Sequence, residues 1–209
     1  MELLALTARE LLDRFASPDP TPGGGSAAAL AGATAAALVA MVCRMPKSRT
    51  GDPGERTRLD EALARASAAG DRLRKLVDED SAAYQGVVAA YRLPKASDDE
   101  KAARKRAIDA AVSLATEVPL RTAEECLAVL DAARTAGADG NPNAASDART
   151  ASALAWAGVK GAAENVRINL GAAGPSSVRE RIDDVEREAG ARLAALGLAP
   201  AGPAPGGGR

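Results

Sequence analysis

One nearly uninterrupted run of small apolar residues, from Ala27 to Cys43, constrains the fold of this chain more than any other segment. The run is mostly alanine and glycine, and it is shorter and less hydrophobic than the roughly 20 apolar residues of a membrane span. It therefore predicts a helix that is buried on all sides within the protein. We expect no membrane as a partner. Ser26 is the expected N-cap, and Pro46 places the helix end near Met45.

The remaining composition favours helices as well. Alanine is the commonest residue, and aromatic residues make up only 2% of the 209. Alanine is the strongest helix former, whereas strands favour the β-branched and aromatic side chains that are scarce here. We expect an all-α fold, a single-domain antiparallel bundle of about five to six helices around the central alanine-rich helix. Residues 1–197 form this domain in our prediction, and residues 198–209, rich in proline and glycine, form a disordered tail.

Apolar periodicity and breaker residues place the other helices. We expect them at residues 2–16, 55–92, 99–134, 146–170 and 177–196. Pro119 lies inside one of these segments, and proline removes a backbone donor and crowds the preceding turn, so we expect a kink or a division into two helices there. Alanine-rich helices also leave a broad apolar surface, which favours a homodimer.

The absence of histidine excludes several chemistries. Ser-His-Asp and Cys-His catalysis and histidine-ligated zinc or haem all require it. Cys43 and Cys126 are far apart, and two lone cysteines indicate a reducing, cytoplasmic location, as does a start without a signal-peptide pattern. The chain has 27 basic and 28 acidic residues, so its charge gives no reason to expect nucleic acid as a partner.

The first polar segment precedes the buried helix and contains Gly23, Gly24, Gly25 and Ser26. Glycines allow close approach of a ligand, and the free N–H groups of a helix start can receive an anion or an oxyanion. The segment matches neither a P-loop nor a dinucleotide-binding fingerprint. The alternative is a flexible turn that ends in an N-cap.

The second segment, residues 78–80, is acidic and is followed by two tyrosines. Asp80 and Tyr84 are four residues apart and share a helix face. A carboxylate among aromatic and apolar neighbours can have a raised pKa and serve as an acid or a base. The alternative is an acidic turn of a solvated helix. Lys95, just after this helix, can pair with an anionic ligand or simply be solvated.

The third segment, residues 141–147, places amide, hydroxyl and carboxylate groups in one short loop. Asn143, Ser146 and Asp147 are its candidates for a site. The alternative is an ordinary turn and helix cap, because asparagine, serine and aspartate favour both.

The fourth segment carries Asn165 and Asn169, four residues apart in a helical pattern. Asparagine is a poor interior helix residue, because its side chain competes for backbone hydrogen bonds. Two asparagines on one apolar face need partners. These partners are either loops of the same protein or the amide-rich ring of a ligand.

In this order and spacing, the segments resemble the cyclodeaminase domain of formiminotransferase-cyclodeaminase and the related bacterial methenyltetrahydrofolate cyclohydrolases. The resemblance covers about residues 3–195. It is carried by TPGGGSAAALAGATAAALVAMV (21–42), DEDSAAYQGVVAAYRLPK (78–95), VPL (118–120), NPNAASD (141–147) and NVRINL (165–170). The resemblance implies an all-helical fold, a homodimer and a folate site without a metal or a cofactor. Since the formiminotransferase half is absent, it also implies a stand-alone domain with a separate formiminotransferase as a partner.

The resemblance further implies a folate one-carbon enzyme acting on the carbon that bridges N5 and N10 of tetrahydrofolate. The reaction is either cyclodeamination of 5-formiminotetrahydrofolate to 5,10-methenyltetrahydrofolate and ammonia, or hydrolysis of 5,10-methenyltetrahydrofolate to 10-formyltetrahydrofolate. Asp80 is the candidate acid/base, and Asp147 is its rival. The expected substrate-binding residues are Gly23, Gly24, Gly25, Ser26, Tyr84, Lys95, Asn143, Ser146, Asn165 and Asn169.

A non-catalytic folate-binding or helical interaction protein of the same fold is the alternative function. The two hypotheses differ in what they predict for the polar groups. In an enzyme, Asp80, Asn143, Asp147 and Asn165 are expected to converge on one pocket beside the glycine segment.

Overall fold

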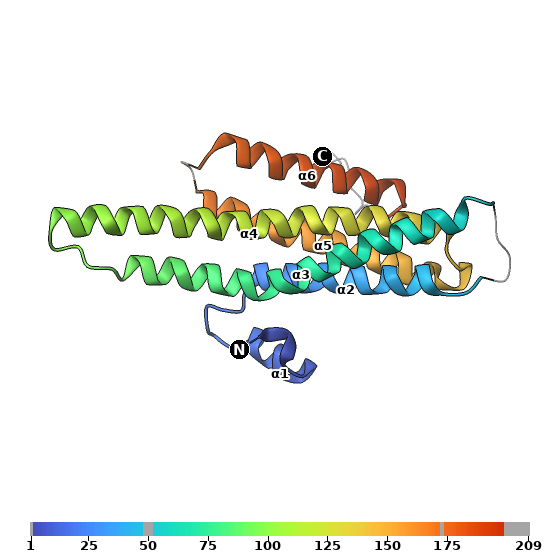
Figure 1. Ribbon diagram of the computed structural model, residues 1–209, viewed down its shortest axis with the longest axis horizontal. Coiled ribbons are helices and arrows are strands. Elements are labelled where there is room, and N and C mark those ends of the chain that lie inside the picture. The colour runs from blue at the N-terminus through green and yellow to red at the C-terminus, as the bar shows by residue number, and fades with distance from the viewer. Residues whose placement is uncertain (1, 48–51, 172–173, 199–209) are drawn as a thin grey trace, which may run out of the picture.

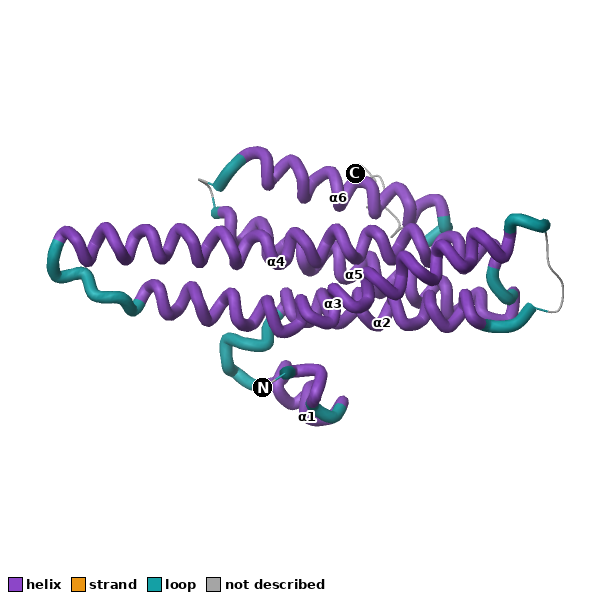
Figure 2. The backbone as a smooth tube through the Cα atoms, in the orientation of Figure 1, coloured by secondary structure: helices purple, strands orange, loops and turns teal. Residues whose placement is uncertain are grey.

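Six α-helices account for most of the residues that the computed structural model describes, which are 2–47, 52–171 and 174–198 (Figure 1). They are α1 (Ala8–Ala16), α2 (Gly24–Arg44), α3 (Glu55–Tyr91), α4 (Asp98–Asp139), α5 (Ala145–Leu170) and α6 (Ser176–Ala195), with 3-10 turns η1 (Leu3–Ala5) and η2 (Pro142–Ala144). No strand occurs in the described ranges (Figure 2). The prediction of an all-α bundle is confirmed, whereas the predicted tail lies almost wholly outside the described residues.

Helix α2 is the central element of the bundle. It packs against α3, α4 and α5, while α6 lies along α4 and α5 and α1 lies to one side (Figure 1). By length and composition alone α2 is apolar enough to cross a membrane, but most of its side chains are buried inside the bundle. This burial supports the interpretation of α2 as a core helix.

Two predicted helix starts need correction. Ser26 is not the N-cap of α2, because the helix begins at Gly24 and Gly23 is the capping residue. The Ser26 side chain is instead fully buried in the first turn and contacts α3. The predicted helix over residues 2–16 is divided into η1 and α1, because Thr7 and Glu10 form a capping box that starts α1.

Pro119 does not divide α4, which continues as one helix from Asp98 to Asp139. A proline has no N–H to donate to the carbonyl group four residues earlier, here that of Ala115. The side chain of Asn169 replaces this donor, because its Nδ2 lies 2.6 Å from the carbonyl oxygen of Ala115. A hydrogen bond from α5 thus satisfies the acceptor that Pro119 leaves free and joins the two helices.

Two glycines allow α2, α4 and α5 to approach closely around Cys126 of α4. A Cβ atom at Gly32 of α2 would lie 2.4 Å from the sulfur of Cys126, and one at Gly158 of α5 would lie 2.6 Å from it. Cys126 is fully buried, so its side chain has no room to move away. Any side chain at either glycine would therefore force the helices apart.

We expect Gly158→Ala to lower the free energy of unfolding by about 1–3 kcal/mol, because overpacking outweighs the better helix propensity of alanine. Urea unfolding followed by circular dichroism measures this change. Gly86→Ala on α3 is the matched control, since nothing lies within 4 Å of its added Cβ. Equal unfolding midpoints for the two variants would show that Gly158 is not a packing constraint.

Candidate functional site

The glycine segment forms the N-terminus of α2. The first backbone hydrogen bond of the helix runs from the N–H of Ala27 to the carbonyl oxygen of Gly23, at 3.0 Å. The N–H groups of Gly24, Gly25 and Ser26 therefore have no acceptor within the helix. Together with the helix dipole they favour a negative charge at this position.

The three acidic residues 78–80 of α3 have three different partners. Asp78 accepts a hydrogen bond of 2.8 Å from the N–H of Leu3 and so fixes η1 against the bundle. Glu79 forms an ion pair with Arg121 of α4. Asp80 alone faces the start of α2. The interpretation of this segment as an acidic turn of a solvated helix is wrong for Asp80, which is half-buried.

The Asp80 carboxylate lies directly on the backbone of α2. Its Oδ2 is 3.0 Å from the hydroxyl oxygen of Ser26, which also lies within donating distance of the carbonyl oxygen of Val77, at 2.8 Å. A Cβ atom at Gly25 would lie 2.0 Å from Oδ1 of Asp80. Only glycine therefore fits at position 25 while the carboxylate keeps this place.

Burial raises the pKa of the Asp80 carboxyl above its ordinary value, because removal from water disfavours the charged form. Hydrogen bonds from the side chain and the backbone of Ser26 act in the opposite direction without cancelling the effect of burial. A carboxyl group with a raised pKa both donates and accepts protons more readily near neutral pH. A half-buried carboxyl group with a raised pKa beside a helix N-terminus is typical of residues that act as an acid or a base.

A cavity of about 350 Å³ opens beside Asp80, and we call it the Asp80 cavity. Of the residues that the sequence predicts for the site, it brings together Gly23, Gly24, Gly25, Asp80, Tyr84, Asn165 and Asn169. Its other lining residues are Pro20, Thr21, Val87, Val112, Ala115 and Ile168. Ser26 lies beneath the carboxylate rather than on the cavity wall. The cavity therefore combines one carboxyl group, amide groups and apolar walls, which suits a flat heterocyclic ligand.

Both asparagines use their amide nitrogens within the protein. Asn165 Nδ2 donates to the carbonyl oxygen of Gly161 at 2.8 Å, and Asn169 Nδ2 donates to that of Ala115. Among the described residues, no hydrogen bond is donated to either side-chain oxygen. The two Oδ1 atoms are consequently the groups that these side chains can offer to a ligand with N–H donors.

Asn143, Ser146 and Asp147 lie at the opposite end of α2. The connection between α4 and α5 that carries them is fixed beside the C-terminus of α2, where Asn141 Nδ2 lies 2.6 Å from the carbonyl oxygen of Pro46 (Figure 1). A helix rises 1.5 Å per residue, so α2 separates the two ends by about 30 Å. The expectation that these groups converge with Asp80 is wrong within one chain.

Lys95 also lies outside the Asp80 cavity. It is exposed in the loop after α3, beyond Leu93 and Pro94. Because the proline ends the helix, Lys95 no longer follows the helix face that carries Asp80 and Tyr84.

Sequence reasoning missed Ile168, which lines the cavity although 76% of its surface is exposed. A signal for it exists, because positions 165, 168 and 169 share one helix face and two of them were candidates. Val112 and Ala115 were missed as well. Both residues belong to α4, and the sequence around them does not indicate that this part of α4 packs beside the start of α2.

The described residues contain no group of three or more histidine, cysteine, aspartate or glutamate side chains placed to hold a metal ion. Both cysteines are buried and free. Burial raises the pKa of the Cys126 thiol to about 12, so this thiol is not a nucleophile at neutral pH. Asp80 is therefore the described group with the clearest capacity for chemistry.

We expect Asp80→Asn to become more stable relative to the wild type as the pH rises from about 4 to 8. The ordinary pKa of the carboxyl is 3.8 and the folded value is higher. Protonation therefore stabilises the folded wild type fully below about pH 3.8, and this stabilisation is lost as the pH rises through the folded pKa. Urea unfolding of both proteins at several pH values measures the difference. A difference that shifts in favour of the wild type would mean that the pKa is lowered instead.

Comparisons with known proteins point to one family. The family model described as formiminotransferase-cyclodeaminase matches residues 7–187. A methenyltetrahydrofolate cyclohydrolase of Methylorubrum extorquens is 39% identical, over 88% of this chain and 91% of that protein. A formimidoyltransferase-cyclodeaminase of Rattus norvegicus is 32% identical over 89% of this chain, which spans only 33% of that longer protein.

The fold also matches a solved structure. The crystal structure of formiminotetrahydrofolate cyclodeaminase from Thermotoga maritima superposes with a TM-score of 0.76 at 26% identity, and the match covers 93% of both chains. The family model covers all the residues that line the Asp80 cavity. The chain belongs to the formiminotransferase-cyclodeaminase family.

Proposed function

We propose that this protein is a folate one-carbon enzyme that acts on the carbon bridging N5 and N10 of tetrahydrofolate. The observation that carries the proposal is the Asp80 carboxyl of α3, which has a raised pKa and faces the start of α2 on the wall of a cavity. Relatives named as a methenyltetrahydrofolate cyclohydrolase and as formimidoyltransferase-cyclodeaminases support the substrate class.

Both candidate reactions need proton transfer around one tetrahedral carbon. In hydrolysis, water adds to the cationic bridging carbon and loses a proton, and the bond to N5 breaks as N5 gains a proton. The hydroxyl group on that carbon releases its remaining proton to the solvent as the formyl carbonyl forms. In cyclodeamination, N10 adds to the formimino carbon and loses a proton, and the leaving nitrogen gains one and departs as ammonia. One carboxyl group that accepts the first proton and returns the second serves either reaction.

The residues around the cavity divide the work. Asp80 moves the protons, and the free N–H groups of Gly24 and Gly25 face negative charge that develops at the reacting centre. The side-chain oxygens of Asn165 and Asn169 accept hydrogen bonds from the N–H groups of the pterin ring.

Hydrolysis of 5,10-methenyltetrahydrofolate is our first candidate. The cyclohydrolase of Methylorubrum extorquens has 39% identity and nearly the same length, against 32% for the formimidoyltransferase-cyclodeaminase of Rattus norvegicus. Cyclodeamination is the second candidate, because the Thermotoga maritima protein of matching fold and length carries that name.

We also propose a homodimer, a separate formiminotransferase as a partner and a cytoplasmic location. Several large apolar side chains are exposed on the chain, and these support association: Leu12, Tyr91, Leu114 and Ile168. The two free cysteines support a reducing compartment.

The absorbance band of 5,10-methenyltetrahydrofolate distinguishes the two reactions. With purified protein, we expect the band to decay faster than in a control without enzyme when methenyltetrahydrofolate is supplied. Growth of the band from 5-formiminotetrahydrofolate, with release of ammonia, would instead identify a cyclodeaminase. No change in either reaction, with folded helical protein, would favour the non-catalytic folate-binding or interaction protein.

Asp80→Asn is expected to lower kcat by about 10²–10⁴-fold while the protein stays folded, because the amide cannot transfer the proton. Asp71→Asn is the matched control on the same helix, since the Asp71 side chain is 71% exposed and pairs with Arg74 on the surface. Full activity of Asp80→Asn would remove this residue from the mechanism. A loss in Asp147→Asn as well would require a second chain, because about 30 Å separates the two carboxylates within one chain.

Light scattering after size-exclusion chromatography tests the homodimer. We expect a mass near twice the 21.1 kDa of the chain, because burying the exposed apolar side chains favours association. A mass of one chain at micromolar concentration would contradict the dimer but would leave the proposed reaction intact.

A further inference from the structure

Two grooves adjoin the Asp80 cavity on different sides. The first, of about 630 Å³, shares Pro20, Thr21 and Tyr84 with the cavity, and we call it the arginine groove. The second, of about 540 Å³, lies between α4, α5, the start of α6 and the end of α3 and shares Val112 and Asn169 with the cavity. A ligand longer than the cavity can therefore extend into either of these grooves.

The two grooves carry opposite charge. The arginine groove is lined by two basic side chains, Arg14 and Arg92, and one acidic side chain, Asp19. The second groove is lined by Asp109 and Glu117 and by no basic residue. A hollow beneath η1 also borders Thr21, but it contains two acidic residues and one basic residue. An anionic extension of the ligand is therefore favoured only in the arginine groove.

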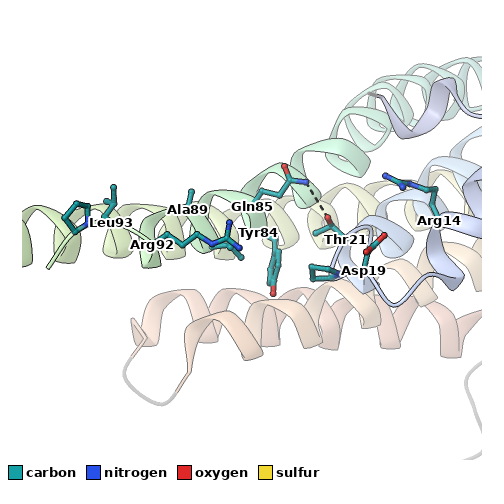
Figure 3. A pocket seen from close by; sticks show the side chains of 11 residues that line it. Arg14, Asp19, Thr21, Tyr84, Gln85, Ala89, Arg92 and Leu93 are labelled. Carbon is teal, nitrogen blue, oxygen red and sulfur yellow. Dashed lines mark hydrogen bonds between the residues drawn. The ribbon is translucent and has the colours of Figure 1, made fainter.

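Arg14 and Arg92 are available to bind an anion. Among the described residues neither forms an ion pair, whereas arginines elsewhere on the bundle, such as Arg58, Arg167 and Arg181, are paired with carboxylates. In Figure 3 the two side chains lie on either side of Tyr84 and Thr21, and the guanidinium group of Arg92 points toward Tyr84.

We propose that the arginine groove binds the glutamyl tail of the folate substrate, with Arg14 and Arg92 receiving its carboxylates. This inference rests on the proposed function, because it assumes a folate derivative in the Asp80 cavity. The tail carries two carboxylates at neutral pH, and a guanidinium group binds a carboxylate with two parallel hydrogen bonds.

The groove also fits the part of the substrate that precedes the tail. Tyr84 lines both the Asp80 cavity and the arginine groove, so it lies where the aminobenzoyl ring must pass between them. Its aromatic ring offers a stacking surface to that ring. The side chains of Val88, Ala89 and Leu93 add an apolar wall.

In this assignment Arg92, rather than Lys95, pairs with the anionic part of the ligand. The residues that line the groove reach Pro94 but do not include Lys95. Arg92 takes its place because it still belongs to the end of α3 as the C-cap residue.

A substrate that lacks the tail tests the proposal. The specificity constant kcat/KM is measured for 5,10-methenyltetrahydrofolate and for 5,10-methenyltetrahydropteroate, which has no glutamate, or for the corresponding formimino pair if deamination is the reaction. We expect the wild type to prefer the folate by about 10-fold, mainly through KM, because the pteroate has one carboxylate on its aminobenzoyl ring in place of the two carboxylates of the tail. We expect the preference to weaken as salt is added.

The double variant Arg14→Gln/Arg92→Gln is expected to lose this preference, because kcat/KM for the folate falls about 10-fold toward the value for the pteroate. Arg65→Gln is the matched control, because Arg65 is an exposed arginine of α3 that does not line the cavity or the groove. We expect this control to keep the wild-type preference.

The outcomes separate the two proposals. A wild type that turns over both substrates with equal kcat/KM would support the folate enzyme and overturn the tail site. A double variant that keeps the wild-type preference would also overturn the tail site alone. A wild type that acts on neither substrate pair would overturn the proposed function and this inference with it.

Discussion

Close contact between α2 and the three helices around it is the constraint on which the rest of the structure depends. Alanine and glycine on α2 leave its backbone within reach of its neighbours, and Gly32 and Gly158 leave room for the buried sulfur of Cys126. A helix with larger side chains would stand about 8–10 Å from its neighbours and would bury its own start less completely. The thin helix thus sets the spacing of the whole bundle.

The same closeness creates the candidate site. The Asp80 carboxylate occupies the space that a side chain at Gly25 would need, and it therefore contacts the first turn of α2 directly. Burial raises the pKa of Asp80, and the free N–H groups of the helix start offset part of the cost of that burial. The close packing of α2 against α3 is therefore also the cause of the raised pKa of Asp80.

A second contact links stability to the site. Asn169 completes the hydrogen bonding that Pro119 interrupts in α4 and at the same time lines the Asp80 cavity. Its orientation is thereby fixed by the backbone of another helix rather than by a ligand. Such a preset amide loses little freedom when a substrate binds, which favours affinity and positioning.

The sequence by itself determined the helical fold, the central helix and the motifs from which Asp80, Tyr84, Asn165 and Asn169 were predicted, because periodicity, alanine content and helix breakers act locally. It also showed that Asp80 and Tyr84 share a face. Only the tertiary structure decided which segments meet. It placed Asn143, Ser146 and Asp147 some 30 Å from Asp80 and brought Arg14 and Arg92 to one groove, since such distances depend on how whole helices pack and not on spacing along the chain.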